Sequence, residues 1–163
     1  MVKVLIKKLN SKVKLPNYKT SGSSGMDLMA FTDNPIRITP NTLKIIPTGL
    51  SIAIPEDLEV QIRPRSGLSA KFNLGILNTP GTIDSDYRGE LKIILFNHGK
   101  NDYVVNNNDR IAQMVLTPIV KMELEEVNDL PETLRGSGGF GSTGKWKIFL
   151  IKHQFKDTPD KWF

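Results

Sequence analysis

Short runs of alternating hydrophobic and polar residues recur along this chain, separated by proline, glycine and asparagine. Alternation with a period of two residues is typical of strands that bury one face. The pattern predicts strands over residues 2–9, 43–46, 50–54, 58–62, 91–96, 111–117 and 120–124. Only residues 66–72 favour a helical turn or two. Many short strands predict an all-β fold, either a sandwich, a barrel or a jelly roll.

Composition narrows this picture. The chain has 163 residues, of which 39% are hydrophobic, and no shift in composition divides it, which favours one core with appendages. It has no cysteine, which excludes a disulfide framework and a thiolate metal site. Charged residues interrupt the first nine positions too often for a signal peptide, and no apolar run reaches membrane-spanning length. We therefore expect a cytoplasmic protein with no membrane partner.

The net charge is +5, and its distribution argues against a nucleic-acid partner. Residues 145–163 hold five lysines against Asp157 and Asp160, so this segment carries +3 and the remainder only +2. A protein that binds a nucleic-acid backbone needs a broad basic face. We therefore expect no nucleic acid among the partners.

The most distinctive segment is RGSGGFGSTG at residues 135–144, in which five glycines surround Arg135, Phe140 and three hydroxyl side chains. Its flexible backbone and its donors suit a phosphate, and Phe140 offers a flat face to a base. The alternative is a flexible linker. The pattern predicts a β domain over residues 1–128, a glycine-rich arm over 129–144 and a separate tail over 145–163.

Residues 139–146 nearly match a P-loop, but Trp146 stands where that motif requires a serine or threonine for magnesium. The segment before it, residues 128–135, contains Pro131 and no strand-like apolar run. Both observations argue against a P-loop fold.

Two polar clusters lie in or beside predicted secondary structure. One is at the start of the predicted helix, and the other is within a predicted strand. Arg65, Ser66 and Gly67 open the helical stretch, so they form either a phosphate grip or a turn capped by Ser66. Gln113 stands among apolar residues of a predicted strand, where its amide needs partners. It either satisfies backbone groups or points into a shared site.

Residues 81–90 form a third cluster, in a turn that we expect to belong to a hairpin between residues 76–77 and 91–96. An aspartate is ordinarily ionised at pH 7, so Asp84 is suited to orient and deprotonate a water molecule. Tyr87 is placed to lie against a sugar. The alternative is that Asp84 and Asp86 cap the turn and that Arg88 pairs with Glu90 or Asp86.

Five clusters in this order resemble the five motifs of the trimeric dUTPases: residues 25–28 (GMDL), 64–67 (PRSG), 81–89 (GTID through YRG), 110–113 (RIAQ) and 135–144. The resemblance spans residues 25–144. It implies a jelly-roll-like β barrel with a mobile glycine-rich C-terminal arm. It also implies a homotrimer whose active sites lie at subunit interfaces, with the arm closing over a neighbour's nucleotide.

The resemblance further implies hydrolysis of dUTP to dUMP and pyrophosphate, which limits uracil incorporation into DNA and supplies dUMP for dTMP synthesis. Asp84 would activate the water that attacks the α-phosphorus. Mg²⁺ would be held mainly by substrate phosphates and waters, with Asp27 either touching a metal-bound water or serving only a structural role.

Binding roles follow from the same resemblance. The phosphates would be held by Arg65, Ser66, Gly67, Gln113, Arg135, Gly141, Ser142 and Thr143. Uracil and deoxyribose would be bound by Asn78, Thr82, Ile83, Tyr87, Lys92 and Phe140, with Tyr87 excluding a ribose 2′-hydroxyl and Phe140 stacking on the base.

The tail at residues 145–163 departs from compact members of the family, and its Trp146, Ile148 and Leu150 alternate like a strand. Two other functions stay open. One is a dCTP deaminase of the same fold. The other is a nucleotide-sensing regulator that binds a protein partner through this tail.

Overall fold

The computed structural model describes residues 2–139. By its internal contacts the chain divides into two units, residues 1–122 and 123–163. The first unit holds all the strands and the helix of the described residues. None of the helices in this described part is long and apolar enough to cross a membrane.

The elements follow one another in the order β1 (Leu5–Lys8), β2 (Met26–Met29), β3 (Ile36–Ile38), β4 (Leu43–Pro47), β5 (Leu50–Ala53), β6 (Leu58–Arg63), α1 (Ser66–Phe72), β7 (Leu74–Ile76), β8 (Gly81–Ile83), β9 (Lys92–Asn97), β10 (Tyr103–Val105) and β11 (Arg110–Pro118). The predicted all-β fold is therefore confirmed. The sheets are consistent with a jelly-roll-like arrangement.

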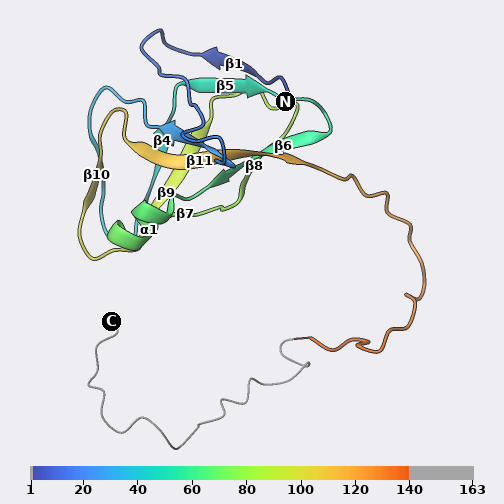
Figure 1. Ribbon diagram of the computed structural model, residues 1–163. Helices are drawn as coiled ribbons and strands as arrows, with labels where there is room; N and C mark the ends of the chain where they lie inside the picture. The colour runs from blue at the N-terminus through green and yellow to red at the C-terminus, as the bar shows by residue number, and fades with distance from the viewer. Residues whose placement is uncertain (1, 140–163) are drawn as a thin grey trace, which may run out of the picture. The chain divides into compact units, whose positions relative to one another are not determined.

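All strand pairs are antiparallel, and the connections cross between sheets (Figure 1). The largest sheet has the order β2-β11-β6-β8, and a second has the order β4-β9-β7. Two further pairs are β1-β5 and β10-β3. Strands distant in sequence thus become neighbours. This pairing brings together Asp27, residues 63–65 and residues 110–113.

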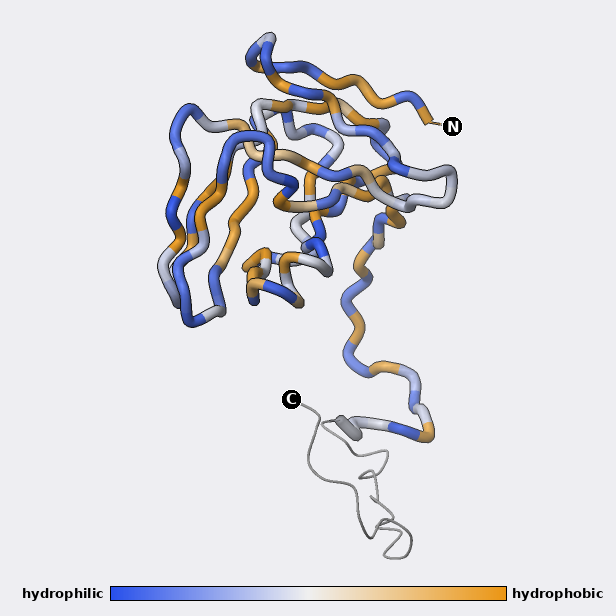
Figure 2. The backbone as a smooth tube through the Cα atoms, turned by 60° about the vertical axis from the view of Figure 1, so that its left-hand side comes forward, coloured by the Kyte–Doolittle hydropathy of each residue, from blue (hydrophilic) through white to orange (hydrophobic). Residues whose placement is uncertain are grey.

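Alternation of hydrophobic and polar residues builds the core, and Figure 2 shows this alternation along the strands. In β6 and β9 every second residue is buried. Burial of one aliphatic side chain contributes about 1.5–3 kcal/mol. The most deeply buried large side chains of this core are Leu28, Ile38, Ile46, Leu50, Leu74, Leu91, Ile93, Leu95 and Ile111.

Most of the predicted elements are confirmed. The helix begins and ends at the predicted residues, and β4, β5, β6, β9 and β11 lie within one residue of their predicted bounds. The predicted pairing of residues 76–77 with the 91–96 strand is also confirmed, because Ile76 is opposite Leu95 and Leu77 N donates to Ile94 O at 3.0 Å. The intervening β8 pairs with β6 instead.

The strand predicted over residues 120–124 is wrong. Residues 119–127 have no strand in the structure, and Val120 and Leu124 are 97% and 85% exposed. Alternation produces a strand only where a neighbouring edge supplies hydrogen bonds and a surface covers the apolar face. The described part of this chain supplies neither to the segment.

Candidate functional site

Asp27 on β2 holds two arginines that are distant in sequence. Its Oδ1 accepts from Arg65 Nε at 2.9 Å, and its Oδ2 accepts from Arg110 Nη1 at 3.0 Å. The carboxylate side chain is only 18% exposed, so these ion pairs are better shielded than ordinary surface pairs. We call Asp27, Arg65 and Arg110 the arginine cluster.

Arg65 is fixed by a second contact as well. Its Nη1 donates to the carbonyl oxygen of Arg110 at 3.1 Å, so two separate nitrogens of the guanidinium are held, one by Asp27 and one by β11. Arg65 also occupies the N-cap position of α1, with its carbonyl accepting from Leu68 N and Ser69 N. Its Nη2 has no partner among the described residues, so the N–H groups of this nitrogen, which we call the free edge of Arg65, are open to an anion.

Ser66 and Gly67 form the first turn of α1 and are exposed. The alternative in which Ser66 caps this turn is wrong, because Arg65 is the N-cap residue and no side chain caps the helix. The Ser66 hydroxyl makes no hydrogen bond within the described residues. It is therefore free for a ligand beside the open edge of Arg65.

Gln113 joins the same region from β11. It lies opposite Asp27 of β2 and opposite Arg63 of β6, and its Nε2 donates to Pro64 O at 2.9 Å. Gly25 permits this arrangement, since a Cβ there would lie 3.0 Å from Met114 O and 3.3 Å from Gln113 Oε1. The structure thus brings together three of the motifs, those containing Asp27, Arg65 and Gln113.

The segment around Asp84 is a separate feature. It follows β8 in a turn in which Tyr87 N donates to Asp84 O at 3.2 Å, and the side chains of Asp84 and Tyr87 are exposed. No side-chain hydrogen bond of Asp84 or Asp86 forms within the described residues, so the capping alternative has no support there.

Arg88 does not pair with Glu90 or Asp86. It donates instead to the carbonyls of Ser85 and Tyr87, which the turn brings within its reach.

Tyr87 is folded back over Gly89. Its hydroxyl donates to Glu90 O at 3.1 Å. A Cβ on Gly89 would lie 2.3 Å from the Tyr87 hydroxyl oxygen, so this ring position requires glycine. One face of the ring lies against the backbone, and the side chain keeps 43% exposure.

The other predicted base and sugar residues surround this segment. Thr82 and Ile83 are in β8, opposite Gln61 and Val60 of β6. The Asn78 amide lies close to Gly81, since a Cβ at Gly81 would be 3.2 Å from Asn78 Nδ2. Lys92 Nζ is 3.7 Å from Glu90 Oε2 at the start of β9.

The two groups of predicted residues are not joined by side-chain contacts within the described part of one chain. Within residues 2–139, no side-chain hydrogen bond or ion pair joins Asp84 or Tyr87 to the arginine cluster or Gln113. In the second unit, Arg135 Nε donates to Gly138 O at 2.7 Å. Phe140, Gly141, Ser142, Thr143 and the tail at 145–163 lie outside the described residues.

Sequence reasoning missed two residues of this region. Arg110 is part of the RIAQ motif, three residues before Gln113, and the sequence gives it no role of its own. Tyr103 of β10 gave no signal, yet burial raises the pKa of its hydroxyl, as does the negative charge of Asp109, while Arg65 lowers it. Tyr103 therefore stays neutral at physiological pH, with its ring 5.2 Å from that of Phe72.

The acidic residues do not form a protein-only metal cage. Within the described part of the chain, no three His, Asp or Glu side chains gather closely enough to hold an ion. Each Asp27 oxygen accepts one arginine contact, and a carboxylate oxygen has a second lone pair for a water. The Asp27 carboxylate therefore fits a site in which Mg²⁺ is held mainly by phosphates and waters, the usual arrangement in nucleotide sites.

Comparison with known proteins relates these features to one family. The chain is 52% identical over 145 residues to a deoxyuridine 5'-triphosphate nucleotidohydrolase of Rickettsia felis, covering 88% of this chain and 98% of the relative. A mutant dUTPase of Staphylococcus bacteriophage 80alpha with dUpNHpp has a TM-score of 0.79 and 26% identity, over 88% of this chain and 99% of that one.

A mutant dUTPase from phage phi11 of S. aureus, described for its coordination of a structural Mg(II) ion, shares the fold. Its TM-score is 0.72 at 23% identity, over 80% of this chain and 99% of that one. The family model for dUTPase matches residues 11–144, which contain all five motifs and stop before the tail. The chain belongs to the dUTPase family.

Proposed function

We propose that this protein hydrolyses dUTP to dUMP and pyrophosphate. The observation that carries the proposal is the geometry of Arg65, whose Nε and Nη1 are held by Asp27 and Arg110 while Nη2 stays free. A guanidinium fixed through two of its nitrogens binds phosphate oxygens with little loss of side-chain entropy. The Rickettsia relative at 52% identity supports the same activity.

The free edge of Arg65 defines the phosphate site. Ser66 and Gly67 contribute donors from the first turn of α1, and Gln113 approaches from β11 with its amide oriented by Pro64 O. The arm completes the grip on the distal phosphates through Arg135, Gly141, Ser142 and Thr143. Closing of the arm excludes water from the triphosphate, which strengthens these charged contacts.

Asp84 supplies the base. Its carboxylate accepts a proton from a water molecule as the water oxygen attacks the α-phosphorus. The bond from the α-phosphorus to the bridging oxygen breaks, giving dUMP and pyrophosphate. Bound Mg²⁺ would neutralise charge on the phosphate oxygens. Asp27 orients Arg65 and Arg110, and its remaining lone pairs would be available to a water bound to the ion.

Selection of the nucleotide belongs to the segment around β8. Asn78 and the backbone of Thr82 and Ile83 bind the uracil edge, with Lys92 nearby and Phe140 of the arm stacked on the base. Cytosine presents a different pattern of hydrogen-bond donors and acceptors, so it would leave buried groups of the site unpaired and bind more weakly than uracil. Tyr87 packs against deoxyribose and excludes a ribose hydroxyl, because its ring is fixed by Glu90 O and Gly89.

Replacing Gly89 with alanine tests the role of the Tyr87 ring. The added Cβ displaces the ring and breaks its hydrogen bond to Glu90 O. We expect the preference for dUTP over UTP in kcat/KM to fall about tenfold, the scale set by one poorly fitted group in a pocket. Gly22→Ala is the matched control, since a Cβ there meets no atom within 4 Å. An unchanged preference in Gly89→Ala would contradict the role.

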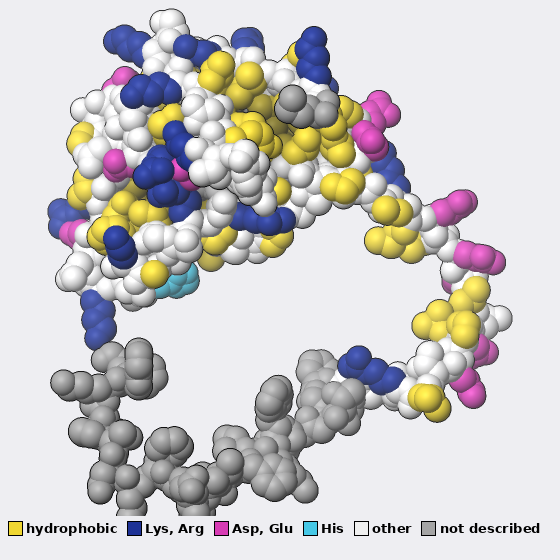
Figure 3. All heavy atoms as spheres, viewed as in Figure 1, with side chains coloured by type: hydrophobic (Ala, Val, Ile, Leu, Met, Phe, Trp, Pro, Cys, Tyr) yellow, Lys and Arg dark blue, Asp and Glu magenta, His cyan; other side chains and the backbone are white. Residues whose placement is uncertain are grey.

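The protein is further proposed to act as a homotrimer with sites between chains. Asp84 and the arginine cluster are not linked in one chain, which suits a site built from several. Exposed apolar residues at Val120, Met122 and Leu124, and an apolar cavity of about 470 Å³ beside β1, are surfaces that assembly would bury. Figure 3 shows hydrophobic side chains gathered on one face of the first unit. Sedimentation equilibrium should give three times the chain mass.

Activity is tested by Mg²⁺-dependent pyrophosphate release from dUTP, dTTP, dCTP and UTP in parallel. Release from dUTP alone is expected. Ammonia release from dCTP would indicate the deaminase instead, and tight dUTP binding without turnover would indicate the nucleotide sensor. As a dUTP hydrolase, the protein is also proposed to limit uracil in DNA, to supply dUMP and to be located in the cytoplasm. A regulatory partner for the tail at 145–163 is a separate proposal, tested by pull-down with and without the tail.

A further inference from the structure

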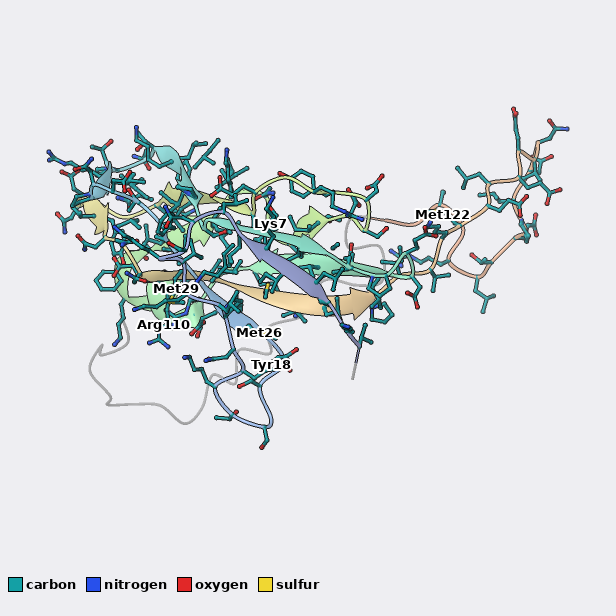
Figure 4. The ribbon with its side chains drawn as sticks, turned by 90° about the horizontal axis from the view of Figure 1, so that it is seen from above. Lys7, Tyr18, Met26, Met29, Arg110 and Met122 are labelled. Carbon is teal, nitrogen blue, oxygen red and sulfur yellow. The ribbon has the colours of Figure 1, made fainter. Side chains whose placement is uncertain are left out.

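A second cavity lies next to the arginine cluster, between β2, the start of β11 and the loop that precedes β2. It has a volume of about 290 Å³. Figure 4 shows this loop, marked by Tyr18, beside Met26 and Met29, with Arg110 next to Met29. Polar residues of the lining are Lys14, Asn17, Lys19, Asp27 and Arg110, and the apolar ones are Leu15, Pro16 and Met29.

The cavity carries an excess of positive charge. Lys14, Lys19 and Arg110 face one carboxylate, that of Asp27, which also pairs with Arg65. Neither lysine forms an ion pair or a side-chain hydrogen bond within residues 2–139. Their charges are therefore available to an anion.

The loop that carries the lysines is attached at both ends. Val13, before Lys14, is 4% exposed and belongs to the core, and Gly25 packs against Met114 O. Between them, Thr20 N and Thr20 Oγ1 contact Ser23 Oγ at 3.1 and 2.9 Å. The lysines are thus presented by an ordered loop, so an anion between them costs less ordering entropy than one between free side chains.

The lining indicates an inorganic anion rather than a nucleotide. It contains no aromatic ring on which a base could stack and only one amide, that of Asn17. The volume corresponds to about ten water molecules at about 30 Å³ each, enough for a small polyanion. Several cations around one small space favour a ligand with several negative charges.

Arg110 connects this cavity to the proposed phosphate site. Asp27 binds Arg110 with one oxygen and Arg65 with the other, and the Arg110 carbonyl also accepts from Arg65. The cavity and the proposed phosphate site therefore share Asp27, which pairs with one arginine of each. We propose that Lys14, Lys19 and Arg110 form a second anion subsite that binds pyrophosphate.

This assignment rests on the proposed function, in which pyrophosphate is the inorganic product. Its test is calorimetric titration of the full-length protein with pyrophosphate, in Mg²⁺ and a saturating non-hydrolysable dUTP analogue that fills the primary site. We expect one pyrophosphate per chain. The double variant Lys14→Gln/Lys19→Gln should bind it about tenfold more weakly, because two charged contacts at exposed positions are lost.

The control double variant Lys44→Gln/Lys100→Gln removes the same charge from exposed positions outside the cavity. It should bind pyrophosphate like the original protein. Equal weakening in both variants, or none in the Lys14/Lys19 variant, would overturn the subsite. Orthophosphate is titrated in parallel, and binding as tight as that of pyrophosphate would overturn the pyrophosphate assignment.

A protein that does not hydrolyse dUTP would refute the proposed function, and the calorimetric result would still decide the anion subsite because it needs no turnover.

Discussion

Replacing Asp84 with asparagine is expected to lower kcat for dUTP by about 10²–10⁴-fold, the usual contribution of a positioned general base. The amide keeps the size of the side chain but cannot accept the proton of the attacking water. Affinity for dUTP should change little, since Asp84 makes no side-chain contact that holds the fold within the described residues. Single-turnover kinetics with equilibrium binding separates the two effects.

Asp86→Asn is the matched control for this variant. Asp86 lies in the same turn, is exposed like Asp84, and loses the same charge on substitution. Its kcat should stay within about twofold, as exposed substitutions away from a site usually have small effects. Comparable loss in both variants would assign the effect to the charge of the turn, and full activity in Asp84→Asn would refute the mechanism.

The elements that sequence patterning predicted well are those whose pattern coincides with their burial. In β6, Leu58, Val60 and Ile62 alternate with residues that are half-buried or exposed, so local periodicity and packing agree. The helix of residues 66–72 was also identifiable, because it follows a strand and a proline. Its end at Asn73, in a left-handed conformation, is a common helix termination.

The elements that patterning missed have no local signal. β3, β7, β8 and β10 contain three residues each and β2 contains four, too few to show a period. Their existence depends on neighbours such as β9 and β6, which lie elsewhere in the sequence. Residues 120–124 show the reverse case. They have the alternating pattern of a strand, but no neighbouring strand pairs with them within the described part of the chain.

For the candidate site, too, the sequence predicted some features and could not predict others. Residue types identified Arg65 and Gln113 as candidates, but the sequence left Asp27 with two open roles. Its partners are 38 and 83 positions away, and the pairing of β11 with both β2 and β6 brings them together. The structure supports a positioning role for Asp27, while the five-motif order was sufficient to indicate the family before any geometry was known.

Arg65→Lys is expected to lower kcat/KM for dUTP by about 10²-fold, although the charge is kept. One ammonium cannot contact Asp27 Oδ1, Arg110 O and a phosphate together, whereas the guanidinium has separate nitrogens for each. Loss of one or two charge-assisted hydrogen bonds, at about 1.5–3 kcal/mol each, accounts for this factor. Steady-state kinetics measures it.

Arg63→Lys is the control, because Arg63 is exposed nearby and contacts only Gln61 among the described residues. Its kcat/KM should be nearly unchanged. A double-mutant cycle with Asp27→Asn then separates positioning from binding. If Asp27 acts by fixing Arg65, adding Asp27→Asn to Arg65→Lys should cost much less than it costs the original protein. Additive losses would mean that Asp27 contributes independently of Arg65, and its positioning role would be refuted.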